Sequence, residues 1–255
     1  MPTALIVEDE PEANKLLGIL LRLRGYETSP AFTGKGALEH IEKHKPDVIF
    51  LDLMLPDLSG YEVCKILKFS KATSLIPLLI ITARIAAENR IESFCLGADD
   101  YIAKPYTPDR IFEALEQSMR WAELGRRDLV QGNISFDHND DGEILRRLGQ
   151  FRSLLLARTS LNLEAIIQLS RAIKEIWCLA DEWVWAYPSE HFTSLTYTLT
   201  AQRLVLSFSD AGGWLDTVRA LAENPASSIQ CAAFHQIDLQ TANGCLTLVK
   251  ELPAP

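Results

Sequence analysis

The chain has 255 residues, 47% of them hydrophobic and 23% charged, which is enough for one large or two ordinary domains with buried cores. Its net charge is −9, and neither half has the basic excess that neutralises nucleic-acid phosphates, so the charge disfavours DNA as a partner. No run approaches the roughly 18–20 apolar residues of a membrane span, and the N-terminus lacks signal-peptide features. We therefore expect a cytoplasmic protein without a membrane partner.

Short apolar runs alternate five times with amphipathic segments in the first 121 residues. Runs such as VIFLDL and LLIIT are apolar on both faces, as in strands that helices cover on both sides. The expected strands are Ala4–Val7, Tyr26–Pro30, Asp47–Leu51, Leu78–Thr82 and Asp99–Ala103. The expected helices are Glu12–Arg24, Lys35–His44, Tyr61–Phe69, Ala87–Leu96 and Pro108–Trp121. This order predicts an α/β fold, a (βα)5 doubly wound parallel sheet.

The composition changes after the last of these helices. Residues 125–143 are polar and turn-rich, and we expect them to form a linker between a first domain at 1–124 and a second at 144–255. The second domain reads as α+β, with helices first and antiparallel strands later. Its expected elements are helices at Ile144–Arg158 and Leu163–Ala186, strands at Ser194–Thr200 and Leu204–Ser209, a short helix at Leu215–Ala222, and a hairpin from Gln236 to Glu251 turning at Asn243–Gly244.

Polar residues end four of the first five strands. Glu8 and Asp9 end the first, Asp52 the third, Thr82 the fourth, and Lys104 follows the fifth. Taken singly, an acidic pair is usually a helix cap and a strand-ending Asp a turn former. Together, three carboxylates at one sheet edge repel one another unless a hard divalent cation such as Mg²⁺ or Mn²⁺ is present. A carboxylate nucleophile, a metal and a lysine without a His or Ser-based general base are typical of phosphoryl transfer to a carboxylate.

The same residues lie in four motifs that resemble the receiver domains of two-component response regulators, which have a flavodoxin-like fold. The motifs are VEDE at Val7–Glu10, DLMLPDLSG at Asp52–Gly60, ITA at Ile81–Ala83 and GADDYIAKPY at Gly97–Tyr106. The resemblance implies phosphorelay signal transduction, with a cognate histidine kinase or phosphotransfer protein as partner. The only catalysis it implies in this domain is the receiver's own phosphorylation and dephosphorylation. The alternative is a degenerate receiver that is never phosphorylated.

The resemblance also assigns roles to individual residues. Asp52 is the phosphoacceptor, and Lys104 and Thr82 are the other catalytic residues. The implied ligands of Mg²⁺ (or Mn²⁺) are Glu8, mostly through water, together with Asp9, Asp52 and the carbonyl of Met54.

A switch follows from the same resemblance. Thr82 and Tyr101 form the switch pair, and the Lys104–Pro105 peptide bond is expected to be cis. The signal is expected to leave by the face made by the fourth helix, the fifth strand and the fifth helix.

The element order of the second domain is similar to the GHKL-type ATP-binding domains of histidine kinases and anti-sigma-factor kinases. The segment SDAGGW stands where that family has DxGxG, so Asp210 and Gly212 match while Trp214 replaces a glycine. The preceding helix has Trp177 at the catalytic Glu position and Asp181 at the metal-binding Asn position. The resemblance thus implies a degenerate domain with a vestigial nucleotide site at Asp181, Asp210 and Gly212. The alternative for the DAGG segment is an ordinary turn that uses glycine flexibility.

Three hypotheses for the output remain open. The first is a protein-binding output domain that acts on an output protein partner, and a homodimer is compatible with it. The second is an active ATP-binding, kinase-like output with ATPase or kinase activity, which the missing Glu, Asn and second glycine box disfavour. The third is a DNA-binding transcription regulator, which the charge and the lack of a basic recognition helix disfavour.

Overall fold

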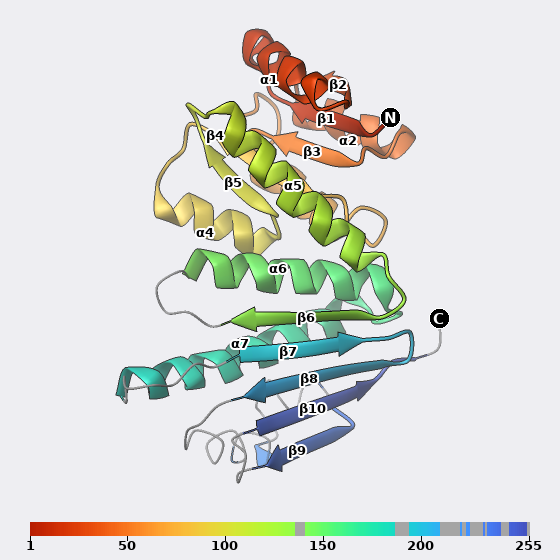
Figure 1. The fold of residues 1–255 in the computed structure, drawn as a ribbon, viewed down its shortest axis with the longest axis vertical. Coiled ribbons are helices and arrows are strands. Elements are labelled where there is room, and N and C mark those ends of the chain that lie inside the picture. The colour runs from red at the N-terminus through yellow and green to blue at the C-terminus, as the bar shows by residue number, and fades with distance from the viewer. Residues whose placement is uncertain are drawn as a thin grey trace. The chain divides into compact units, whose positions relative to one another are not determined.

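The computed structural model divides the chain into two compact units. Met1–Arg126 and Gly149–Ala157 form the first unit, and Arg127–Leu148 and Arg158–Pro255 form the second. The described residues are 1–135, 141–186, 194–209, 220, 223–224, 232, 234–240 and 245–253. Each unit contains its own five-stranded sheet (Figure 1). Among the described residues, no helix combines the length and the apolar character that crossing a membrane requires.

The first unit is a parallel sheet with strand order β2-β1-β3-β4-β5, which confirms the predicted doubly wound fold. Its strands are β1 (Thr3–Val7), β2 (Glu27–Ala31), β3 (Val48–Leu51), β4 (Leu78–Thr82) and β5 (Asp100–Ala103). Its helices are α1 (Pro11–Leu23), α2 (Gly34–Lys43), α3 (Gly60–Lys68), α4 (Ala87–Leu96) and α5 (Pro108–Gly125). Every residue of β3 and β4 is buried, as strands covered on both faces must be.

Local signals in the sequence set where these helices begin and end. The Thr33 hydroxyl accepts a hydrogen bond from the Gly36 backbone N–H at the start of α2, and Thr107 accepts one from Arg110 N–H at the start of α5. A capping box of Ser59 and Glu62 begins α3. Gly97 ends α4 in the left-handed conformation, with φ of 103°.

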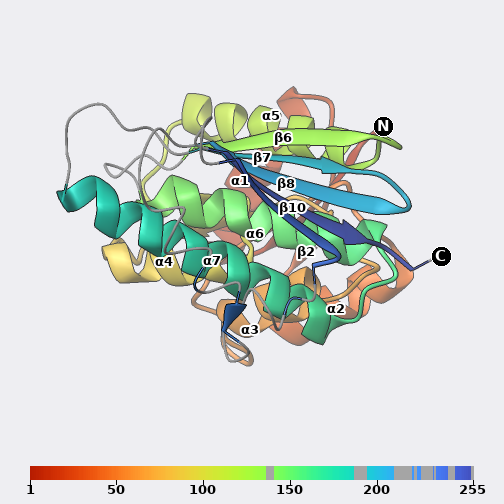
Figure 2. The ribbon, with the colours of Figure 1, turned by 90° about the horizontal axis from the view of Figure 1, so that it is seen from below.

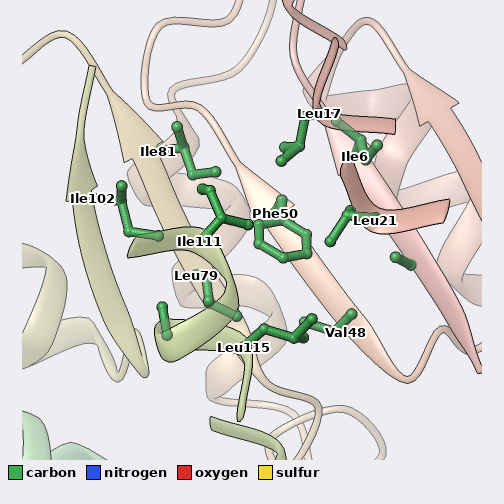
Figure 3. Close-up of a cluster of buried hydrophobic side chains, with 12 residues drawn as sticks. Ile6, Leu17, Leu21, Val48, Phe50, Leu79, Ile81, Ile102, Ile111 and Leu115 are labelled. Atoms are coloured by element: carbon green, nitrogen blue, oxygen red, sulfur yellow. The ribbon is translucent and has the colours of Figure 1, made fainter. Parts of the chain in front are cut away.

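The core of the first unit lies between the parallel sheet and two of its helices. Phe50 of β3 lies among Leu17 and Leu21 of α1 and Ile111 and Leu115 of α5 (Figure 3). All five side chains are at most 4% exposed. Helices α1 and α5 therefore cover one face of the sheet.

The second unit is an antiparallel sheet with strand order β6-β7-β8-β10-β9. Its strands are β6 (Val130–Ser135), β7 (Ser194–Leu199), β8 (Arg203–Ser209), β9 (Gln236–Gln240) and β10 (Cys245–Glu251), and its helices are α6 (Asp141–Arg158) and α7 (Leu163–Ala186). Figures 1 and 2 show α7 running along one face of this sheet. Leu204, Leu206 and Phe208 of β8 are fully buried, the alternation of a strand with one covered face.

The segment 125–143, expected as a linker, contains strand β6, and α5 continues past the expected end at Trp121 to Gly125. The strand carries only two strongly buried apolar residues, Val130 and Ile134, among polar neighbours. Its structure comes from pairing with β7, more than fifty positions away in the chain, so local composition does not reveal it.

Two further predictions concern the C-terminal part of the second unit. The C-terminal hairpin is present as the antiparallel pair β9 and β10, while its turn at Asn243–Gly244 lies outside the described residues. The expected short helix at Leu215–Ala222 lies almost wholly outside the described residues as well.

Candidate functional site

Three charged side chains meet at the carboxyl edge of the parallel sheet. Lys104 Nζ lies 2.5 Å from Glu8 Oε2 and 2.6 Å from Asp52 Oδ2. Glu8 follows β1, Asp52 follows β3 and Lys104 follows β5, and parallel strands end at the same edge. Glu8 and Asp52 are only 7% and 6% exposed. The structure thus brings together three of the site residues that we predicted from the sequence.

Burial and ion pairing act in opposite directions on these charges. Burial raises the pKa of Glu8, and the hydrogen bond from Lys104 opposes that rise only in part. For Lys104, burial acts to lower the pKa, but the hydrogen bonds to Asp52 and Glu8 outweigh it and raise the pKa above its ordinary value. Lys104 is therefore held as a cation beside the Asp52 carboxylate.

The loop after Asp52 binds the Asp52 carboxylate, and the end of this loop at Gly60 lies close to the backbone of Asp52 and Leu53. The Met54 N–H donates a hydrogen bond of 2.9 Å to Asp52 Oδ1. A Cβ atom at Gly60 would lie 2.3 Å from the Asp52 carbonyl oxygen and 2.6 Å from Leu53 Cα, so only glycine fits there. The start of α3 is thereby packed directly against the backbone of Asp52 and Leu53.

A buried asparagine supports the loop that carries Glu8, and we did not select it from the sequence. Asn14 of α1 is 4% exposed, and its side-chain amide donates to the carbonyls of Ile6 and Glu8 at 3.1 and 3.3 Å. The signal in the sequence is weak, because one polar residue on the inner face of an amphipathic helix has many explanations.

The predicted switch residues contact the same loop residue. Thr82 is fully buried, and its hydroxyl oxygen accepts a hydrogen bond of 3.4 Å from the Arg84 N–H. The Tyr101 hydroxyl donates to the Arg84 carbonyl, and burial raises the pKa of Tyr101 to about 12, so the hydroxyl stays protonated. Both side chains are thus joined to the β4–α4 loop. The Lys104–Pro105 peptide bond is cis, as expected.

The predicted metal ligands are brought together only in part. Asp9 is exposed, and among the described residues no three acidic, histidine or cysteine side chains converge into a metal-binding cluster. The donors at this edge still have the chemistry that Mg²⁺ prefers, because Glu8, Asp9, Asp52 and the Met54 carbonyl all offer oxygen. Two buried carboxylates against one ammonium also leave an excess of negative charge when both are ionised.

The predicted vestigial nucleotide site cannot be built from the described residues. Asp210 and Gly212 lie outside them. Asp181 lies on α7, but its side chain is not among those described.

Comparison with known proteins identifies the family. Residues 4–116 match the family model of the response regulator receiver domain. The chain is 31% identical over 185 residues to a Mycobacterium tuberculosis protein named "Probable transcriptional regulatory protein TcrX", an alignment that covers 69% of this chain and 77% of TcrX. The chain belongs to the response regulators.

Other response regulators align over different shares of their length. "Transcriptional regulatory protein KdpE" of M. tuberculosis is 37% identical over 47% of this chain and 52% of its own, so the chain spans about half of KdpE. "DNA-binding response regulator MtrA" of Mycolicibacterium smegmatis is 29% identical over 72% of this chain and 78% of MtrA. Among solved structures, the receiver domain of Francisella response regulator 1452 is 32% identical, covers 47% of this chain and 98% of its own, and has a TM-score of 0.44.

Proposed function

We propose that this response regulator is phosphorylated on Asp52 in a two-component phosphorelay, with a cognate histidine kinase or phosphotransfer protein as donor. The observation that carries the proposal is the Lys104 ammonium, which lies 2.6 Å from the Asp52 carboxylate at the sheet edge. A carboxylate oxygen of Asp52 would attack the phosphorus atom while the donor leaves, and Lys104 would neutralise charge on a phosphoryl oxygen.

Receiver domains bind Mg²⁺ at their phosphorylation site. In this chain Glu8, Asp9, Asp52 and the carbonyl of Met54 would hold Mg²⁺ or Mn²⁺, which supplies further positive charge to the phosphoryl group. The oxygen donors and the excess of buried acid support this proposal.

Acetyl phosphate with Mg²⁺ is expected to add one acid-labile phosphoryl group to the wild-type protein and none to Asp52→Asn. The reason is that the amide of asparagine cannot act as the nucleophile. Intact-mass spectrometry measures the result directly. Asp57→Asn, which changes an exposed carboxylate of the following loop, is the matched control and is expected to accept the group as the wild type does. A phosphoryl group that persists in Asp52→Asn would rule out the assignment.

Thr82→Ala is expected to be phosphorylated like the wild type but to lose the response of the output. Thr82 is not the nucleophile, yet it and Tyr101 are joined to the same loop residue, Arg84. The measurement is light scattering and capture of the output partner with and without beryllofluoride. A full wild-type response in Thr82→Ala would show that the signal leaves the receiver by another route.

For the output we propose protein binding by a degenerate GHKL-like second unit in the cytoplasm. Two observations support it: one strand and two helices precede the hairpin of β7 and β8, and a second hairpin of β9 and β10 ends the chain. The motif residues Asp210 and Gly212 lie outside the described residues, so the element order carries this part of the proposal.

DNA binding is the second candidate, and the relatives favour it over a kinase-like output. The names of TcrX and KdpE describe transcriptional regulatory proteins, and that of MtrA a DNA-binding one. The expectation from charge alone that DNA is disfavoured therefore does not exclude it. A gel shift with genomic DNA, with and without beryllofluoride, separates the two: a shift that depends on beryllofluoride supports DNA binding, and its absence supports protein binding.

A further inference from the structure

An open groove lies in the first unit where the end of α1 and the start of β2 meet α5. Its volume is about 700 Å³, within the roughly 300–1,000 Å³ that is usual for small-molecule sites. We call it the α1–α5 groove. Asp52 follows the carboxyl end of β3, whereas Tyr26 of the groove precedes the amino end of β2. The groove therefore reaches the edge of the sheet opposite to the charged site.

The floor of the α1–α5 groove is apolar and partly aromatic. Tyr26, Phe112 and Met119 are half-buried and pack against the core of the first unit. Leu115, which also lines the groove, belongs to that core and is 4% exposed (Figure 3). Burial raises the pKa of Tyr26, so its ring is uncharged at neutral pH. Such a floor favours a flat apolar group, because aromatic rings stack on one another.

An arginine without an ionic partner stands beside this floor. The Arg24 guanidinium carbon lies 4.1 Å from the centre of the Phe112 ring, a cation–π contact. Arg24 is exposed, and among the described residues its side chain has no hydrogen-bond or ion-pair partner. A planar guanidinium presents parallel N–H donors that match the two oxygens of a carboxylate. The groove thus offers a site for an acidic group directly beside an aromatic surface.

The charges around the groove match a ligand with a single negative charge. Three arginines and two glutamates line it, which leaves an excess of one positive charge: Arg24, Arg120, Arg126, Glu116 and Glu123. Glu116 and Arg120 are 3.9 Å apart and their side chains are 62% and 70% exposed, so this pair is weak. One carboxylate would neutralise the excess. A phosphate dianion would instead face both glutamates and the C-terminal end of α5, where the helix dipole is negative.

We propose that the α1–α5 groove binds a small aromatic monocarboxylate, with the carboxylate on Arg24 and the ring over Tyr26, Phe112 and Met119. A concave apolar floor with a few polar groups at its side is the arrangement of a small-molecule site. The inference does not rest on the proposed phosphorylation of Asp52, because the groove is built from other residues.

The methionines make binding visible at defined places. The protein contains Met1, Met54 and Met119, and of these Met119 lines the groove. The full-length protein, labelled with ¹³C at the methionine methyl groups, is titrated with 3-phenylpropionate and followed by NMR. The Met119 signal, assigned by its loss in Met119→Leu, is expected to shift saturably with a Kd of about 1 mM or tighter. The Met1 and Met54 signals are expected to stay in place.

Three related compounds separate the features of the ligand. 3-Phenyl-1-propanol lacks the charge, propionate lacks the ring, and phenyl phosphate carries a second negative charge. All three are expected to bind more weakly than 3-phenylpropionate, the first two by about ten-fold or more. Equal or tighter binding of phenyl phosphate would contradict the charge match of the groove.

Two substitutions are expected to change the affinity for 3-phenylpropionate in opposite directions. Arg24→Leu removes the guanidinium and should weaken binding by about ten-fold or more. Glu116→Gln removes a negative charge and should tighten binding by about two-fold, so the proposal stays testable if Arg24→Leu does not fold. Arg22→Leu is the matched control, because Arg22 is exposed on α1 and its side chain bonds Thr28. Its affinity should equal that of the wild type.

The proposal is overturned if the Met119 signal does not move, or if folded Arg24→Leu binds 3-phenylpropionate as the wild type does. Light scattering reveals a protein occupant. If the wild type is a dimer that Arg24→Leu dissociates, and no probe binds, the groove is an interface between copies of the chain and the proposal fails. None of these outcomes changes the assignment of Asp52, which the phosphorylation experiments test separately.

Discussion

Lys68→Met is expected to lower the free energy of unfolding by about 3–5 kcal/mol, because it leaves a buried carboxylate without its cation. Lys68 and Asp99 are 1% and 2% exposed, so water cannot replace the lost partner. Methionine keeps most of the apolar volume of the lysine side chain, so the loss reports the charge and the hydrogen bonds and not a cavity. Urea unfolding followed by far-UV circular dichroism measures the change.

Two further variants show whether the ion pair is the cause. Arg120→Met removes a pair whose atoms are 3.9 Å apart and whose side chains are 70% and 62% exposed, and its cost is expected to be below about 1 kcal/mol. Adding Asp99→Asn to Lys68→Met removes the uncompensated charge and is expected to recover part of the lost stability. A cost for Lys68→Met as small as that for Arg120→Met would contradict the account of this pair.

Gly60→Ala is expected to cost about 3 kcal/mol of stability, the upper end of the usual penalty for overpacking. The new Cβ atom would lie 2.3 Å from the Asp52 carbonyl oxygen and 2.6 Å from Leu53 Cα. Backbone atoms cannot rotate aside, so the loop that carries Asp52 must shift and phosphorylation should slow. Urea unfolding and the rate of phosphorylation by acetyl phosphate measure the two effects.

Gly18→Ala is the matched control for this substitution. Its Cβ atom would first meet the end of the Arg22 side chain at 3.2 Å, and a flexible side chain can move. Alanine also has a higher helix propensity than glycine, so Gly18→Ala in α1 should leave stability unchanged or raise it. Equal losses for Gly18→Ala and Gly60→Ala would show that close approach to Asp52 is not what requires glycine.

Much of the receiver could be predicted because its signals are local. The run Leu78–Thr82 is a strand and Ala87–Leu96 a helix at the residues expected, since a wholly apolar run and an amphipathic segment differ in period. The charged site could also be predicted from the sequence, because parallel strands bring Glu8, Asp52 and Lys104 to one edge. The exposed position of Asp9 could not be predicted, because the orientation of a side chain after a strand depends on the conformation of the loop.

The rest depends on contacts between distant residues. The sequence marks Lys68 as a basic residue near a helix end, which usually lies in solvent, and nothing near it points to Asp99. Gln150 meets Asp99 across 51 positions, so no local pattern predicts that part of α6 belongs to the first unit. Strand β6 was missed for the same reason, since its pairing partner β7 lies beyond both helices.

The central claim, that Asp52 is the phosphoacceptor, is tested most directly by locating the phosphoryl group. The full-length protein is treated with acetyl phosphate and Mg²⁺ and then with borohydride, which reduces an aspartyl phosphate to homoserine. Peptide mass spectrometry then identifies the converted residue. The account predicts homoserine at position 52 and at no other aspartate. Conversion at Asp9, Asp99 or Asp100, or none at Asp52 in a protein that carries the phosphoryl group, would contradict it.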